Sequence, residues 1–209
     1  MLMKKIFILV FVLLSLNSVA QTIEFKDEAF KNAVLANGVD LDKDHEIQLT
    51  EALACTVLDV SSKDIVDLTE ISYFKNLKEL ACNWNKLTKI DLSKNDSLEI
   101  LSCASNQLTT IDLINNKKLQ QLSFDENPIV NISFVENLLL TKVTCSKTKL
   151  VGLDFHKNIK LFQLNCTNNP DLTYVIVPNV QAAMANKKFK KDENVVWQEK
   201  SKAAQGQRR

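Results

Sequence analysis

The middle of the chain repeats itself every 21 residues, and this period limits the fold more than any other feature. Four apolar columns keep the interval: Leu77, Leu98, Leu119, Leu140 and Leu161; Leu80, Leu101, Leu122, Val143 and Leu164; Leu87, Leu108, Ile129 and Leu150; and Ile90, Ile111, Ile132 and Leu153. An imperfect copy over residues 55–65 precedes them at an offset of 22 residues. A unit this short cannot bury its own apolar side, so neighbouring units must stack and share a core. The period predicts a solenoid in which each unit contributes a strand and a return.

Two further columns hold asparagine and cysteine. The asparagine column is Asn85, Asn106, Asn127 and Asn169, with Thr148 as the exception. An amide at this place can satisfy backbone groups that a turn buries. The cysteine column is Cys82, Cys103, Cys145 and Cys166, and Phe124 occupies the missing place. A column that accepts either cysteine or phenylalanine is an apolar packing position.

The state of the cysteines follows from this placement. Stacked strands are ~4.8 Å apart, which lies within the Cα range of a disulfide, so Cys82–Cys103 and Cys145–Cys166 bonds are conceivable. In-register side chains on parallel strands point the same way, however, and we therefore expect buried free thiols. A zinc site is excluded, because the sequence has no CxxC pair and its two histidines, His45 and His156, lie far apart.

The unit LxxLxCxxNxL, as in LKELACNWNKL at 77–87, resembles the leucine-rich-repeat family over residues 55–178. The resemblance implies an α/β fold, namely a right-handed leucine-rich-repeat solenoid with a parallel sheet on its concave face. The returns, such as TKIDLSKNDS at 88–97, are too short for a full helix. We therefore expect irregular or 3₁₀ segments on the convex face.

The segments outside the repeats suggest four further regions. Residues 1–20 carry Lys4 and Lys5, an apolar run at 6–14, and the small residues Ser18 and Ala20, which predicts a cleaved export signal. A retained amphipathic anchor is the alternative. We expect the mature chain in the periplasm, on the cell surface or secreted, with no integral membrane segment.

Residues 21–54 are predicted to form a helical N-terminal cap, with a helix in EFKDEAFKNAVLANG at 24–38 that begins after Asp27 and stops at Gly38. Residues 179–199 are expected to cap the other end of the solenoid. The basic tail 200–209 is predicted to be disordered, and its charge suggests either a solvated terminus or a polyanion-binding tail.

The acidic stretch DLDKDHEIQLTE at 40–51 matches a twelve-residue calcium loop of the EF-hand type. The candidate ligand positions are 1, 3, 5, 7, 9 and 12, with a backbone carbonyl at position 7, and they are occupied by Asp40, Asp42, Asp44, Glu46, Gln48 and Glu51. His45 stands where the pattern has glycine in a left-handed conformation, which predicts reduced affinity. Because only one such loop is visible, we expect a structural calcium ion that holds the first repeat in place rather than a calcium sensor. An acidic turn between helices, without calcium, is the alternative.

The order of segments resembles that of secreted leucine-rich-repeat proteins of Gram-negative bacteria, which are related in style to the internalins. In this order the sequence has a helix, the acidic loop, EALA at 51–54 and the repeats. Many relatives continue into a C-terminal secretion-sorting domain, which this sequence lacks.

A binding role is the predicted function. The sequence has no nucleophile elbow, no phosphate-binding glycine loop and only three glycines, which argues against an enzyme. The formal charge of +1 gives no reason to expect nucleic acid. We expect the concave face to recognise a protein ligand. The candidate residues there are Asn83, Trp84, Ser102, Ser123, Asp125, Thr144 and Asn165.

Trp84 carries two interpretations, either an exposed anchor for a protein or sugar or a ring packed over Ser105. A structural cell-envelope protein and a glycan-binding adhesin are the alternative functions.

Overall fold

The computed structural model describes residues 21–200, so the predicted export signal and the tail from residue 201 lie outside the described residues. The helices are α1 (Glu28–Ala36), α2 (Leu49–Ala54), the 3₁₀ helix η1 (Thr69–Tyr73) and α3 (Val180–Ala185). The strands are β1 (Val57–Asp59), β2 (Glu79–Ala81), β3 (Ile100–Ser102), β4 (Gln121–Ser123), β5 (Lys142–Thr144), β6 (Gly152–Asp154), β7 (Gln163–Cys166), β8 (Tyr174–Ile176), β9 (Phe189–Lys191) and β10 (Val196–Gln198). None of the described helices has the length and apolar character that crossing a membrane requires.

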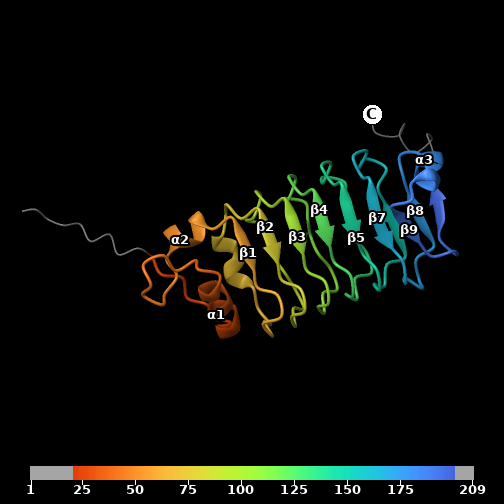
Figure 1. Ribbon diagram of the computed structural model, residues 1–209. Helices are drawn as coiled ribbons and strands as arrows, with labels where there is room; N and C mark the ends of the chain where they lie inside the picture. The colour runs from red at the N-terminus through yellow and green to blue at the C-terminus, as the bar shows by residue number, and fades with distance from the viewer. Residues whose placement is uncertain (1–20, 201–209) are drawn as a thin grey trace, which may run out of the picture.

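Seven strands form one parallel sheet that runs along the molecule (Figure 1). Its order is β1-β2-β3-β4-β5-β7-β9. Leu80 pairs with Leu101, and Leu101 with Leu122, so the 21-residue period of the sequence is the register of the sheet. Leu58 pairs with Leu80, which confirms the 22-residue offset of the first copy. The chain is a leucine-rich-repeat solenoid, as the repeats predicted.

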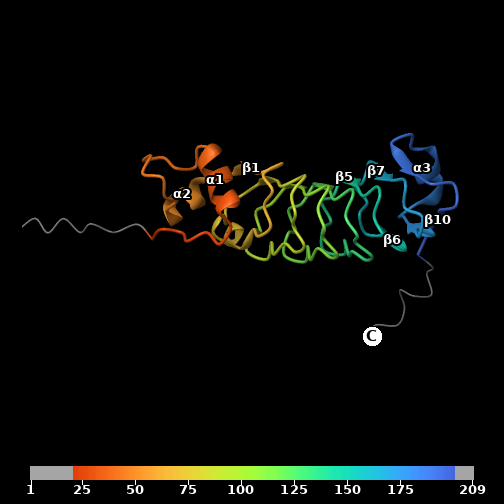
Figure 2. The same ribbon diagram turned by 90° about the horizontal axis from the view of Figure 1, so that it is seen from below.

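The returns at the C-terminal end differ from the expected irregular or 3₁₀ segments. There β6, β8 and β10 pair in parallel and form a second sheet opposite the first (Figure 2). In each of these strands the middle residue is more buried than its two neighbours, which suits an extended half-buried strand. Gly152 lets the coils approach, because a Cβ added there would lie 2.4 Å from the Tyr174 ring.

The core is a stack of buried columns. Besides the columns read from the sequence, a further one on the return side contains Leu92, Leu113, Phe134, Phe155 and Val177, all at most 1% exposed. Phe134 and Phe155 stack face to face, with ring centroids 4.7 Å apart and planes 8° apart. Aromatic rings at this separation add to the stabilisation from area burial.

Two asparagine ladders hold the coils together. In the first, Asn106 Nδ2 donates to the carbonyls of Cys82 and Cys103, and its Oδ1 accepts from the Leu87 N–H. Each such amide joins its own coil to the preceding one. The second ladder was not predicted and consists of the fully buried Asn95, Asn116, Asn137 and Asn158 on the return side. Their Nδ2 groups likewise donate to carbonyls of the preceding coil.

Asp27 joins the helical N-terminal segment to the solenoid. Its Oδ1 accepts from the N–H groups of Ala29 and Phe30, which caps α1 as expected from the sequence. Its Oδ2 accepts from the N–H groups of Val66 and Asp67 in the first coil. Burial opposes ionisation, but these four donors outweigh it and lower the pKa of Asp27.

Parallel pairing continues past residue 178, where the repeats of the sequence were expected to end. Strand β9 pairs with β7, and β10 pairs with β8. The segment 179–199 is therefore a degenerate last coil with α3 inserted into it. The Asp192 carboxylate, rather than the backbone of a further coil, accepts from the N–H groups of Asn168 and Asn169.

Candidate functional site

The outward face of the seven-stranded sheet, called the concave face below, is built by strict alternation. The middle residue of each of β1 to β5 is buried, and its two neighbours are exposed or half-buried. Ser102, Ser123, Thr144 and Asn165 therefore form one row, because each pairs with the next across the sheet. The face is polar and rigidly spaced, with neighbouring strands ~4.8 Å apart.

Asp125 organises the centre of the concave face. Its carboxylate accepts from Ser123 Oγ at 2.9 Å, from Thr144 Oγ1, and from the Ser146 N–H at 2.7 Å. Asn83 has a similar role nearer the N-terminal end of the face, because its Oδ1 accepts from the Ala104 N–H at 2.8 Å. These bonds fix side-chain rotamers, so the bonded side chains of the face have little conformational entropy left to lose.

Trp84 lies at the edge of the concave face with 63% of its surface exposed, which does not support the interpretation of a ring packed over Ser105. Its φ of 53° is left-handed, as are those of Ser105, Glu126, Lys147 and Asn168 at the same place in later coils. Left-handed backbone is unfavourable for a bulky residue. This column was missed at the sequence level, since none of its members is glycine.

Charge changes sign along the concave face. The first two strands carry Asp59 and Glu79, whereas β5 carries Lys142 and β9 carries Lys190, all with outward side chains. Lys190 extends the row of Asn165, because the two residues pair. Sequence inspection missed Lys190, since the 21-residue register is lost after Asn169.

The acidic loop folds with three carboxylates together. Asp40, Asp42 and Asp44 each place one oxygen atom within 4.8 Å of the others. Loss of hydration, with the adjacent Asp44, Glu51 and Asp40 carboxylates, raises the pKa of Asp42. Hard carboxylate oxygens gathered in this way are the donor set that suits calcium.

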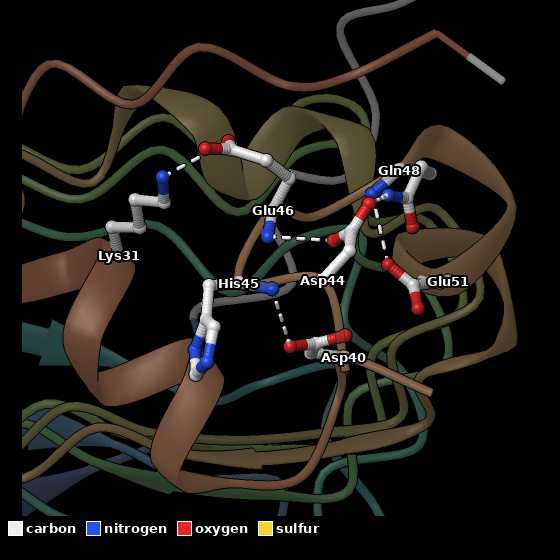
Figure 3. Close-up of polar contacts among 7 residues, drawn as sticks. All are labelled: Lys31, Asp40, Asp44, His45, Glu46, Gln48 and Glu51. Atoms are coloured by element: carbon white, nitrogen blue, oxygen red, sulfur yellow. Dashed lines mark hydrogen bonds and ion pairs between the residues drawn. The ribbon is translucent and has the colours of Figure 1, made fainter. Parts of the chain in front are cut away.

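The backbone of the loop supports this arrangement. Asp40 accepts from the N–H groups of Lys43 and His45, and Asp44 accepts from the Glu46 N–H, so the loop curls around its own carboxylates (Figure 3). His45 has φ of 66°, the left-handed conformation that the calcium pattern requires at this place. For a residue with a β-carbon this conformation costs about 1 kcal/mol.

The remaining three predicted ligands are placed differently. The Glu46 side chain points away from the carboxylates and pairs with Lys31 at 2.9 Å, which leaves its backbone carbonyl as the group for position 7 (Figure 3). Gln48 Nε2 donates a hydrogen bond to Asp44 Oδ2 at 2.9 Å. Glu51 is buried at the start of α2, and its two oxygens accept from the N–H groups of Leu41 and Gln48.

The cysteine column lies in the core behind the concave face. All five cysteines of the chain are free thiols, and Cys82, Cys103, Cys145 and Cys166 are fully buried. Burial raises the pKa of Cys82 to about 12, with a further contribution from Asp59. Their role in the fold is apolar packing, as expected from the Phe124 that shares the column.

The fold is a leucine-rich-repeat solenoid, and its coils match those of solved bacterial leucine-rich-repeat structures. The structure is similar to the functional domain of InlJ from Listeria monocytogenes, which includes a cysteine ladder, with 26% identity and a TM-score of 0.58. The match covers 74% of this chain and 38% of that one, so this chain corresponds to well under half of the InlJ domain.

Two further internalins of Listeria monocytogenes share the fold. Internalin C2 is 19% identical with a TM-score of 0.55, over 87% of this chain and 98% of that one. InlF is 16% identical with a TM-score of 0.54, over 84% and 72%. At these identities the likeness concerns the fold alone. No protein-family model and no curated protein sequence matches this chain.

Proposed function

We propose that this protein is an exported, non-enzymatic binding module that recognises a protein ligand through its concave face. The observation that carries the proposal is the Asp125 network, which holds Ser123, Thr144 and the Ser146 backbone in fixed positions on an accessible sheet. A side-chain array that is already ordered before contact lowers the entropic cost of binding. Export rests on the pattern of residues 1–20.

The ligand that fits this face is extended and carries charge of both signs. Its acidic portion would lie against Lys142 and Lys190, and its basic portion against Asp59 and Glu79. Trp84 supplies an exposed aromatic side chain at the rim, the residue type that most often dominates binding energy. A glycan would use the same ring as a stacking platform, which makes glycan binding the second candidate function.

Calcium is proposed as a structural ion in the loop 40–51. Asp40, Asp42 and Asp44 would supply carboxylate oxygens, and the position of Glu46 leaves its backbone carbonyl available. The loop lies beside the N-terminal segment, where the Ile23 N–H donates to the Ile47 carbonyl at 2.8 Å. An ion there would stiffen the cap that covers the first coil.

Affinity capture from a cell-envelope extract tests the concave face. The immobilised protein is compared with Trp84→Ala, Asp125→Ala and a control, Lys118→Ala, whose exposed side chain lies on the return side. We expect the protein and the control to retain the same partner, and both concave-face variants to lose it. Circular dichroism melting establishes that each variant is folded.

The outcomes separate the candidate functions. Retention of a sugar by the control but not by Trp84→Ala, on a glycan array, would support the adhesin. An identical set of captured proteins for all four chains would contradict recognition through the concave face and favour a structural envelope component.

A further inference from the structure

Both sheets end at the same end of the solenoid in strands that have one open side. β9 is the last strand of the seven-stranded sheet and β10 the last of the second sheet within residues 21–200 (Figures 1 and 2). The N-terminal end differs, because α1 and α2 cover it there. An open strand edge presents backbone donors and acceptors that can pair with another strand.

The orientation of the β9 backbone identifies those groups. The Leu164 N–H donates to the Lys188 carbonyl, and Cys166 Sγ donates to the Lys190 carbonyl, so residues 188 and 190 face β7. Backbone groups alternate in direction along a parallel strand. The carbonyls of Phe189 and Lys191 therefore point to the open side, and so does the N–H of Lys191. The Phe189 N–H is already bonded to Asn186.

A hollow of about 410 Å³ lies next to this edge. It is lined by Val180, Met184, Lys191, Val195, Val196 and Trp197. Met184 and Val196 are 72% and 55% exposed, so apolar surface from α3 and from β10 faces solvent at one place. Lys191 belongs both to the hollow and to the open edge, which joins the two features.

The charge around the edge is positive. Lys187, Lys188, Lys190 and Lys191 fall within five residues. Lys188 lies over the Phe162 ring at 5.0 Å and Lys191 over the Trp197 ring at 5.9 Å. The Asp192 carboxylate in the same segment accepts from the N–H groups of Asn168 and Asn169. Two exposed carboxylates lie nearby, Glu193 and Glu199, and Glu199 Oε1 accepts from the Val180 N–H.

We infer that the β9 edge binds an acidic peptide in extended conformation, which adds a strand to the sheet and places an aliphatic side chain in the hollow beside Trp197. A second copy of this chain is a poorer occupant, because a twofold axis at this edge would bring the four lysines of each copy together. This surface is separate from Trp84 and the centre of the concave face.

Fluorescence titration with a defined peptide tests the inference. The probe is acetyl-EELEVEE-amide, and the protein carries Trp84→Phe so that emission reports Trp197 alone. We expect a saturable change in emission, with affinity that falls at least tenfold in Lys191→Glu, which lies on the edge and lines the hollow, and that falls as salt is raised. The basic peptide acetyl-KKLKVKK-amide is expected to give no change.

N-methylation of the peptide distinguishes strand pairing from charge attraction. Two peptides carry N-methyl groups on odd or on even residues. Since alternate N–H groups of an added strand face the edge, we expect one peptide to lose binding and the other to retain it. Equal affinity for both peptides, or equal binding of the basic peptide, would overturn the inference.

Two further results would also count against it. The change in emission must persist in Trp84→Ala with Asp125→Ala, because its loss there would assign the peptide to the concave face. Concentration-dependent dimers in sedimentation velocity that are lost in Met184→Glu, together with no change in emission on addition of the peptide, would show that a second copy occupies the edge instead.

Discussion

Asn106 Nδ2 donates to the carbonyl of Cys82 at 3.0 Å, across the boundary between two coils. This bond recurs at each asparagine of the ladder, so the stack is held by buried amides as well as by apolar columns. A buried amide that bridges two backbones leaves several groups unsatisfied when it is removed.

Asn106→Ala should lower the free energy of unfolding by about 2–4 kcal/mol, since the carbonyls and the Leu87 N–H that it binds lose a partner in the core. Urea unfolding followed by circular dichroism measures the change. Asn115→Ala is the matched control, because Asn115 is exposed on a turn. Equal midpoints for the two variants would contradict a structural role for the ladder.

Thr148→Asn should stabilise the protein by about 1 kcal/mol, because it completes the ladder with the amide that the other coils carry. Thr148 is buried, and its N–H and Oγ1 both bond to Asn169 Oδ1, at 2.6 and 2.7 Å. Thermal melting should show a rise of roughly 2–4 °C. Thr148→Val, which removes the hydroxyl, should lower the melting temperature. A lower melting temperature for Thr148→Asn as well would contradict the prediction and indicate that the site cannot hold an amide.

Asp27 predicts a loss of stability at low pH. Its pKa is lowered in the folded chain relative to the usual 3.8, so its contribution is present above that value and is lost as the pH falls through the folded pKa. Asp27→Asn should therefore be less stable at pH 7 and differ less from the parent at pH 2–3. Urea midpoints at the two pH values measure this, and a constant difference would refute it.

The thiols predict slow modification in the folded state. Burial raises the pKa of all five, with Cys82 and Cys166 at about 12, and thiolate is the reactive form. Iodoacetamide at pH 8 should modify the half-buried Cys55 first and the other four only in denaturant. Mass spectrometry should count five alkylated groups after denaturation without reductant. A lower count would reveal disulfides between coils.

Calcium should raise the melting temperature by several degrees at 10 mM, which corresponds to about 1–3 kcal/mol for a Kd on the order of 10⁻⁴–10⁻³ M. The rise should vanish in Asp40→Ala and persist in Glu46→Gln, whose side chain pairs with Lys31. The same melting temperature in calcium and in EDTA would exclude the site.

The pH dependence of the calcium effect follows from Asp42. Its pKa is raised in the folded chain, so without the ion the protonated group favours the folded state at low pH, and this contribution is lost as the pH rises through that pKa. Calcium requires the ionised form. The calcium-dependent rise in melting temperature should therefore shrink as the pH is lowered towards 4, and a constant rise would contradict participation of Asp42.

The 21-residue period determined the stacking, the register, the buried columns and the side of each strand that faces solvent, because these are set by spacing along the chain. Leu80, Leu101 and Leu122 pair as the period requires. The calcium pattern of residues 40–51 likewise predicted that Asp40, Asp42 and Asp44 lie together. The side chain of Glu46 instead forms an ion pair with Lys31 on α1, a partner that no local sequence pattern identifies.

Only the tertiary structure decided what lies where the period is interrupted. The pairing of β10 with β8, the placement of Lys190 beside Asn165, and the open edge of β9 all depend on how the last coil closes around α3. The physical reason is that pairing between coils is a long-range contact, and where the repeat is lost its register is chosen by packing against the coil before it.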